Sequence, residues 1–181
     1  MTTSVESPAE VVDGLVRTVP DFPKPGIEFY DIAPVLASAR GLKASVDALI
    51  GACPLEVDVV VGVEARGFIV GAPVAIGIGS GFVPVRKPGK LPGPVISHSY
   101  TLEYGEATLA VQQDAFEAGA RVLLVDDVLA TGGTIAAAAA LTEQLGGVVV
   151  GVSVLLELAG LGGRENLRRA GLGDVHAVVT R

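Results

Sequence analysis

The chain has 181 residues with a formal net charge of −7, and half of its residues are hydrophobic although only 4% are aromatic. This length predicts one domain over residues 1–181, and the acidic balance argues against nucleic acid and anionic membranes as general partners. The single cysteine, Cys53, excludes an internal disulfide and predicts a reducing, cytoplasmic setting, in agreement with the lack of a signal-peptide pattern and of any apolar stretch as long as the ~20 residues of a membrane span.

The N-terminal part is predicted to be a helix followed by an irregular aromatic segment. The pattern Ser7-Pro8-Ala9-Glu10 is typical of a helix start, and apolar residues recur at helical spacing as far as Val19, before Pro20. Residues 20–32 contain three prolines and a glycine, so we expect no regular structure there. This segment holds the aromatic residues Phe22, Phe29 and Tyr30. They could stack on a flat heterocycle, and the alternative is a rigid connector.

A strand with charged residues at its carboxyl end comes next. Residues 36–50 predict a helix, and the β-branched run at 57–63 predicts a buried strand. The turn Glu64-Ala65-Arg66-Gly67 follows that strand, on the side where open α/β sheets bind ligands. A buried helix is then expected over 68–78. Arg66 thus lies on the ligand side of the predicted sheet, and the alternative is a solvated arginine in a turn.

Basic residues gather after a short strand predicted at 82–85. Arg86, Lys87 and Lys90 lie within five positions, although the whole chain has only 13 lysines and arginines. A local cationic patch suits a pyrophosphate group, and the alternative is a solvated surface. Residues 95–101 and 107–113 then alternate like the strands of a hairpin. We expect this hairpin to be a mobile flap, because a long segment rich in proline and glycine precedes it.

The most informative stretch is VLLVDDVLATGGT, residues 122–134. Its first four residues predict a strand buried on both faces, with Asp126 and Asp127 at the carboxyl end. A TGGT turn follows, and the alanine-rich segment after it predicts a helix starting near Thr134. Glycines, hydroxyls and helix N–H groups suit a phosphate, while carboxylates accept from sugar hydroxyls or reach Mg²⁺ through water. This order predicts a ribose 5-phosphate site, and the alternative is an Asp-capped turn after a buried strand.

The remaining elements complete a strand and helix alternation. Residues 148–156 and 176–180 predict two more strands, with a short helix around Leu167 between them. The chain is therefore expected to form an α/β fold with a central parallel sheet flanked by helices. No G-x-x-x-x-G-K-[ST] motif occurs, and the glycines at 77–81 have the wrong spacing for a dinucleotide fingerprint. Two histidines and one cysteine give no zinc site.

These motifs carry a resemblance to a known family. VLLVDDVLATGGT resembles the phosphoribosyl pyrophosphate (PRPP) signature of type I phosphoribosyltransferases. Segments that resemble the adenine-using branch of that family are PDFPKPGIEFYDIAPVL, GVEARGF, RKPGKLPG and SYTLEYGEATLAVQQDA. The resemblance spans most of the chain between residues 16 and 157. It implies the type I phosphoribosyltransferase fold, with a flexible β-hairpin flap and a small N-terminal base-binding hood.

The resemblance also implies a reaction, in which adenine and PRPP give AMP and pyrophosphate, and a homodimer. Mg²⁺ would be held mainly through PRPP and not directly by the protein. Ribose 5-phosphate or AMP would contact Asp126, Asp127, Ala130, Thr131, Gly132, Gly133 and Thr134. Pyrophosphate would contact Arg66, Arg86, Lys87, Lys90 and Tyr104, with Arg86 acting across a subunit interface. The base would meet Glu28, Phe29, Tyr30 and Arg66. The catalytic residues would be Glu103, as acid/base near purine N7, with Asp126 and Asp127.

Two alternative functions stay open at this point. Many members of the family carry a basic residue where Tyr30 stands, which leaves room for a guanine/hypoxanthine or xanthine enzyme. A PRPP- or purine-sensing regulator could keep the fold without catalysis. The acidic chain does not favour the nucleic-acid surface that such a regulator would need.

Overall fold

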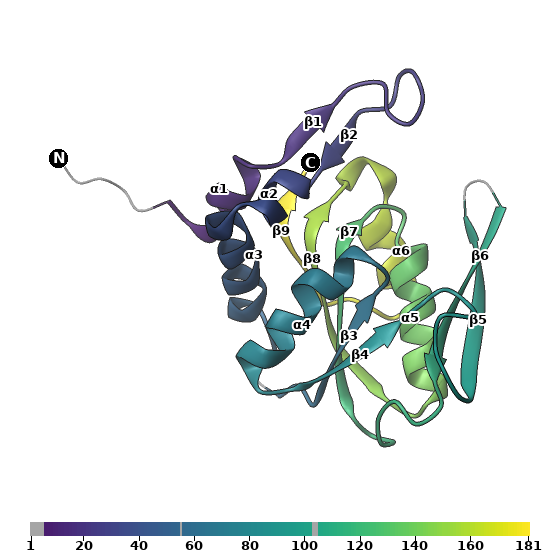
Figure 1. Ribbon diagram of the computed structural model, residues 1–181. Helices are drawn as coiled ribbons and strands as arrows, with labels where there is room; N and C mark the ends of the chain where they lie inside the picture. Colours follow the sequence, from purple (N-terminus) through teal and green to yellow (C-terminus); the bar gives the residue numbers. More distant parts are fainter. Residues whose placement is uncertain (1–5, 55, 103–104) are drawn as a thin grey trace.

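The computed structural model describes residues 6–54, 56–102 and 105–181, and a five-stranded parallel sheet lies at its centre (Figure 1). The strands, in spatial order, are β4 (Gly81–Val85), β3 (Val59–Val63), β7 (Arg121–Leu129), β8 (Val148–Glu157) and β9 (Val175–Thr180). Strand β7 is the middle strand, and its residues 122–125 are almost fully buried. A strand covered on both faces favours an unbroken apolar run, so the valine-rich pattern of the sequence correctly predicted this sheet.

Helices cover both faces of the sheet. The helices α3 (Ala39–Gly51) and α4 (Arg66–Ile78) pack on one face, where Leu123 and Val125 of β7 point. Helix α5 (Gly133–Gln144) and helix α6 (Gly163–Arg169) pack on the other, against Val122 and Leu124. Side chains alternate between faces along a strand, so β7 supplies both layers. Each fully buried Leu or Val contributes about 1.5–3 kcal/mol to this arrangement.

The N-terminal region differs from the prediction of one long helix. Helix α1 (Pro8–Asp13) has the predicted capping box, but Gly14 caps its C-terminal end. Strand β1 (Arg17–Val19) instead pairs antiparallel with β2 (Phe29–Asp31), so part of the segment expected to be irregular is a strand. The 2.5 Å ion pair between Arg17 and Asp31 holds the first residue pair of this ladder. This hairpin, residues 17–31, is called the hood here, and it projects beyond the carboxyl ends of the sheet strands (Figure 1).

The helix predicted over 36–50 is two helices. Helix α2 (Ala33–Ala37) ends at Ser38, where the backbone is extended, and α3 begins directly after it. The Ser38 hydroxyl accepts a hydrogen bond from the N–H of Gly41 at 3.2 Å, which caps the start of α3. A serine with an extended backbone ends one helix and starts the next more readily than it continues a helix.

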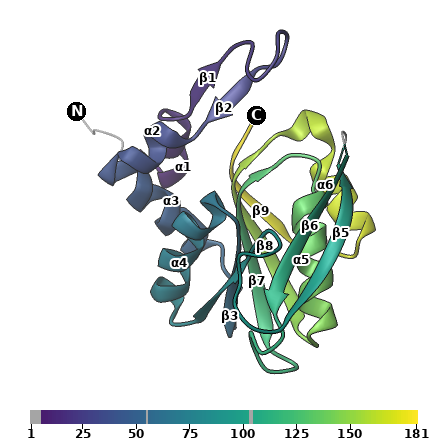
Figure 2. The ribbon, with the colours of Figure 1, turned by 45° about the vertical axis from the view of Figure 1, so that its right-hand side comes forward.

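The flap is an antiparallel hairpin of β5 (Val95–Leu102) and β6 (Gly105–Gln112). It lies beside α5, on the outer side of that helix (Figure 2). Leu109 and Val111 of β6 are buried in the same core cluster as α5, and Tyr100 of β5 packs against that cluster. The base of the flap is therefore packed on the body of the protein. Residues 103 and 104, which carry two predicted site residues, lie outside the described residues.

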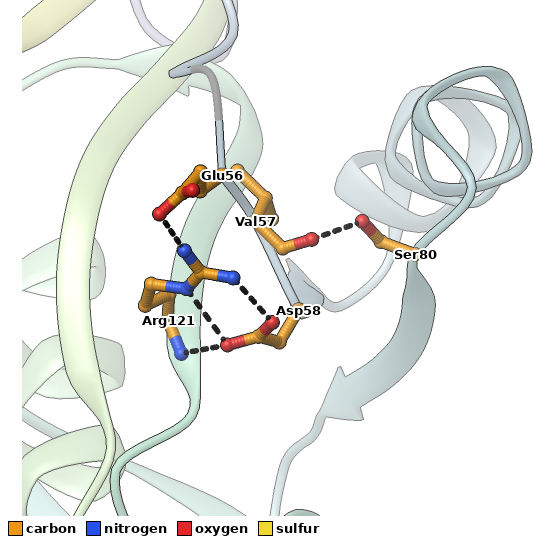
Figure 3. Close-up of polar contacts among 5 residues, drawn as sticks. All are labelled: Glu56, Val57, Asp58, Ser80 and Arg121. Atoms are coloured by element: carbon orange, nitrogen blue, oxygen red, sulfur yellow. Dashed lines mark hydrogen bonds and ion pairs between the residues drawn. The ribbon is translucent and has the colours of Figure 1, made fainter.

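Polar contacts fasten the amino ends of the central strands (Figure 3). The guanidinium of Arg121, at the start of β7, donates to both carboxylate oxygens of Asp58 at 2.9 and 3.0 Å and is paired with Glu56. The Ser80 hydroxyl donates to the carbonyl of Val57 at 2.6 Å. These hydrogen bonds with Arg121 lower the pKa of Asp58 to about 2. The opposite, carboxyl ends of the strands lie under the hood (Figure 1).

Candidate active site

A cavity of about 560 Å³ opens at the carboxyl ends of the sheet strands, under the hood. Ligands of open α/β sheets bind at this edge. The wall residues come from the hood and β2, the end of β7, the end of β8, the start of α4 and the end of β9. They are Ile27, Glu28, Phe29, Tyr30, Ile32, Arg66, Asp127, Val128, Ala130, Leu156, Leu158, Gly160, Leu161 and Arg181. Segments that are distant in sequence thus meet at one mainly apolar hollow.

The acidic pair divides between two environments because neighbouring side chains on a strand face opposite sides. Asp127 lines the cavity, and its carboxylate accepts a hydrogen bond of 2.7 Å from Nε of Arg66. Asp126 does not line the cavity and is only 7% exposed. Its Oδ1 accepts from the N–H of Asp127 at 2.8 Å and lies next to the start of α4, where a Cβ on Gly67 would be 3.0 Å away.

The two carboxyl groups therefore differ in chemistry. Burial raises the pKa of Asp126 well above its usual value, and the neighbouring charge of Asp127 raises it further. Arg66 acts in the opposite direction with a smaller effect. Asp127 faces the cavity with a cationic partner and free acceptor capacity, which suits hydroxyl groups of a bound sugar.

The predicted phosphate loop, residues 130–134, leads from β7 into α5. Gly132 has a φ of 85°, a conformation that favours glycine, and α5 begins at Gly133. Helix α6 supports this loop from outside: the Asn166 side chain donates to the carbonyl of Thr131 at 3.0 Å. Ala130 lines the cavity, whereas residues 131–134 continue beyond its wall. The N–H groups at the start of α5 are available to an anion there.

The predicted base-binding residues lie together in the cavity. Glu28, Phe29 and Tyr30 come from the hood, and Arg66 faces them from the start of α4. The Tyr30 hydroxyl donates to Glu28 at 2.8 Å, and this hydrogen bond raises the pKa of Tyr30. Phe29 packs edge to face against Phe22, with ring centroids 5.0 Å apart. This contact orients an aromatic ring at the cavity wall.

The predicted pyrophosphate residues are only partly in this cavity. Arg86 does not line it and is paired with Glu64 at 3.2 Å, within its own chain. The backbone N–H of Lys87 also donates to Glu64, at 3.0 Å, and this contact, followed by Arg86, lowers the pKa of Glu64. Lys87 and Lys90 are exposed. The sequence prediction did not include Glu64, although its position directly after β3 was a usable signal.

Other site residues were missed for lack of a local signal. Arg181 follows β9 and lines the cavity, and its guanidinium pairs with Asp13 of α1 at 2.6 Å. Leu156, Leu158 and Leu161 supply much of the apolar wall. The predicted residues Glu103 and Tyr104 lie outside the described residues.

Across residues 6–54, 56–102 and 105–181, no group of three or more His, Cys, Asp or Glu side chains is placed to hold a metal ion. Within the same ranges, no helix has the length and apolar character needed to span a membrane.

The fold and the site define a class of protein, the phosphoribosyltransferases, and comparison with known proteins agrees. Residues 28–170 match the phosphoribosyl transferase domain family. An adenine phosphoribosyltransferase of Cutibacterium acnes is 58% identical over 171 residues, which cover 94% of this chain and 97% of the relative. The chain therefore belongs to the phosphoribosyl transferase family, within its adenine phosphoribosyltransferase branch.

Solved structures support the same assignment. The adenine phosphoribosyltransferase of Thermoanaerobacter pseudethanolicus superposes with a TM-score of 0.90 at 46% identity, covering 96% of this chain and 99% of that one. The enzyme of Giardia lamblia, solved with 9-deazaadenine, gives a TM-score of 0.89 at 38% identity, covering 98% and 99%. The resemblance, the fold and the enzyme class expected from the sequence, a pentosyltransferase, are thereby confirmed.

Proposed function

We propose that this enzyme transfers the phosphoribosyl group of PRPP to N9 of adenine, giving AMP and pyrophosphate. One observation carries the assignment to specific residues: a single cavity joins the aromatic hood residue Phe29 to Asp127 and Ala130 at the end of β7. A base held by the hood and a sugar held by β7 would then lie side by side. Bringing two reactants together in this way supplies much of the rate enhancement of a transfer reaction.

The hood and the opposite leucine wall would hold the base. Phe29 stacks on the purine ring, and backbone groups near Glu28 read its Watson–Crick edge. Leu156 and Leu158 exclude water from the other side of the base. Their position in the wall of the same cavity supports this role. Arg66 stands where base and pyrophosphate meet, and its hydrogen bond to Asp127 fixes its direction. Exclusion of water protects the reactive ribosyl centre from hydrolysis.

The end of β7 and the start of α5 would hold ribose 5-phosphate. Asp127 serves the ribose hydroxyls and stabilises positive charge on the ring as the bond to pyrophosphate breaks, and Asp126, which lies behind it, holds the Asp127 backbone N–H. Residues 130–134 hold the 5′-phosphate with hydroxyl groups and N–H groups at the helix start. The positive φ of Gly132 supports this role, because a backbone without Cβ can approach a phosphate closely.

Pyrophosphate would leave toward the basic segment after β4. Arg66, Lys87 and Lys90 neutralise its charge, and Arg86 and Tyr104 complete the set. Mg²⁺ would enter with PRPP and neutralise charge on the leaving group. Asp127, the member of the acidic pair that lines the cavity, could reach its water shell. Glu103 would take the proton from N7 as N9 forms the new bond.

The decisive experiment is a base panel run with PRPP and Mg²⁺, with pyrophosphate release as the readout. We expect kcat/KM for adenine to exceed the values for hypoxanthine, guanine and xanthine at least 100-fold, a discrimination typical of a site built to read one edge of a base. Fastest release with a 6-oxopurine would identify a different purine enzyme. No release with any base would identify a non-catalytic sensor.

Three further properties belong to the proposal: one domain over residues 1–181, a cytoplasmic setting and a homodimer. The two core clusters on opposite faces of one sheet support a single domain. The outer face of α4 supports the homodimer, because Ile69 and Ile76 lie two helical turns apart and are 45% and 82% exposed. Arg86 lies next to this face, with its guanidinium 5.9 Å from the ring centroid of Phe68 in α4.

A further inference from the structure

The flap and the proposed phosphate loop are joined by a pair of hydroxyl groups. The phenol oxygen of Tyr100, on β5, lies 3.1 Å from Oγ1 of Thr134, in the first turn of α5. Both side chains are half-buried. Tyr100 also packs against the core cluster beneath the flap, so its ring is held in place by apolar contacts. The sequence prediction assigned no role to Tyr100.

Strand geometry aims this phenol at α5. Ile96, His98 and Tyr100 alternate with exposed serines along β5, and all three are half-buried on the side of α5. Ser99 faces the other way, and its hydroxyl pairs with Thr108 of β6 at 2.8 Å on the exposed face. Two similar hydroxyl pairs therefore start from neighbouring residues of one strand, but only that of Tyr100 reaches the phosphate loop.

The chemistry of a phosphate makes the direction of these hydrogen bonds important. A hydroxyl carries one proton and two acceptor lone pairs, while the oxygens of a phosphate dianion only accept. Thr134 must therefore use its one proton to bind phosphate. A phenol that donates to Oγ1 of Thr134 leaves that proton free and directs it away from the flap. The donating phenol also polarises the Thr134 hydroxyl, and this strengthens the hydrogen bond that Thr134 donates to the phosphate.

We propose that Tyr100 is a positioning residue of the 5′-phosphate site. Its hydroxyl donates to Thr134, and Thr134 donates to a phosphate oxygen of PRPP or AMP. The inference rests on the proposed function in one respect, namely that residues 130–134 hold this phosphate. It adds that the flap takes part in phosphate binding through its base, independently of the residues at its tip.

The test compares Tyr100→Phe with Ser99→Ala. Each variant removes one hydroxyl from β5 and breaks one hydroxyl pair, but only the first pair involves Thr134. We expect Tyr100→Phe to weaken ribose 5-phosphate binding, measured by calorimetry, about 3- to 10-fold, the usual effect of one lost hydrogen bond. Adenine binding stays unchanged. Ser99→Ala leaves ribose 5-phosphate binding within about 2-fold of the wild type. Unchanged ribose 5-phosphate binding in Tyr100→Phe would overturn the proposal.

A double-mutant cycle separates positioning from simple packing. Thr134→Val removes the second hydroxyl, so Tyr100→Phe has no further effect on ribose 5-phosphate binding in that background. In a Thr134→Ser background the hydroxyl is kept, and the effect of Tyr100→Phe persists. Additive losses in the Thr134→Val background would show that Tyr100 acts through packing, against the proposal. Unchanged ribose 5-phosphate binding in Thr134→Val alone would show that the Thr134 hydroxyl does not donate to the phosphate, which would also overturn the proposal.

Discussion

Asp126 and Asp127 are neighbours in the chain but make different contributions. Asp127 faces the cavity and accepts from Arg66, whereas Asp126 lies between β7 and the start of α4. The alternation of a strand separates them, so a motif of two adjacent carboxylates places one at the ligand and one behind it. Substituting each residue in turn should therefore affect different properties.

Substitution of Asp127 should affect catalysis. Asp127→Asn keeps the size of the side chain but removes the charge that pairs with Arg66 and accepts from the sugar. Loss of a hydrogen bond to a charged group costs about 1.5–3 kcal/mol, so we expect kcat to fall about 10- to 150-fold while the protein stays folded. Steady-state kinetics and circular dichroism measure the two effects. Wild-type kinetics in this variant would contradict the role of Asp127.

Substitution of Asp126 should affect stability as well. Burial raises the pKa of Asp126 in the folded protein above its pKa in the unfolded chain. The protonated side chain therefore contributes its full stability at pH values below the unfolded-state pKa, and this contribution is lost as pH rises through the folded-state pKa. The Asp126→Asn side chain does not ionise. The free energy of unfolding of this variant should therefore increase relative to that of the wild type as pH rises from 4 toward 8. We expect a gain on the order of 1 kcal/mol near neutral pH.

Urea unfolding at pH 5 and pH 8 checks this stability gain. Asp47→Asn is the control, because Asp47 forms an exposed pair with Lys43 on the surface of α3 and such pairs contribute little. A loss of stability in Asp126→Asn at both pH values would contradict the argument.

At the scale of elements, α6 forms a support for the phosphate loop. A Cβ at Gly163 would overlap the carbonyl oxygen of Ala130 and lie 2.8 Å from Leu129. In turn, a Cβ at Gly132 would lie only 3.0 Å from the carbonyl oxygen of Gly163. Glycines on both sides thus allow the loop and the helix to pack backbone against backbone.

Substitution of Gly163 should therefore displace the loop. Gly163→Ala forces a shift of backbone atoms, so we expect a destabilisation of about 1–3 kcal/mol and a KM for PRPP raised about 10-fold, with adenine affinity retained. Gly173→Ala is the matched control, because a Cβ at Gly173 meets nothing within 4 Å. Thermal unfolding and initial-rate kinetics measure both effects. An unchanged KM for PRPP in Gly163→Ala would show that α6 does not position the loop.

Element patterns also explain which parts of the fold could be predicted from the sequence. The valine-rich runs of β3, β7 and β8 are diagnostic because a central parallel strand has no polar face. The resemblance implied an N-terminal hood, but the pairing of β1 with β2 in it was not predicted from the residues, because Val16 and Val19 fit a helical spacing by coincidence. The two strands of the hood are also separated by a proline-rich loop. Cross-strand pairs such as Arg17 with Asp31 form only in the folded chain and leave no periodic signal.

The candidate site shows the same limit. Residues directly after a strand, such as Asp127 and Arg66, could be predicted because the strand end itself indicates the ligand edge. Leu158, Leu161 and Arg181 reach the cavity only because β8 lies beside β7 and β9 lies beside β8 in the folded sheet. An isolated leucine or arginine near the end of a chain carries no information about that placement.

At the scale of the whole molecule, the two ends of the sheet have different roles. Arg121, Asp58 and Glu56 fasten the amino ends of β3 and β7, and the carboxyl ends form the cavity (Figure 3). Fixed amino ends would hold the strand ends in register from outside the cavity, because none of these three residues lines it. Substitution of Asp58 should therefore change stability and leave the kinetics unchanged.

The pH dependence of that stability follows from the lowered pKa of Asp58. A carboxyl group with a pKa of about 2 in the folded protein contributes stability above its unfolded value, near 3.8, and loses it as pH falls toward 2. Asp58→Asn should thus be less stable than the wild type at pH 7, and the difference should shrink below pH 4. Urea midpoints at pH 7, 5 and 3 measure it. A difference that stays constant over this range would exclude the ion pair as its source.

The association of two chains is the largest scale at which the sequence and the structure make a prediction. Ile76 is 82% exposed on α4, and a second copy that covered this face would remove it from water. Burial of the side chain would contribute about 1.5–3 kcal/mol, and a buried lysine there would oppose association.

We therefore expect the wild type to be a dimer at about 10 µM, whereas Ile76→Lys is a monomer, because a loss of several kcal/mol raises the dissociation constant more than 100-fold. Sedimentation velocity measures both states. Val148→Lys, at an exposed valine on β8 away from α4, should stay dimeric. A monomeric wild type, or dissociation of both variants alike, would exclude the α4 face as the interface.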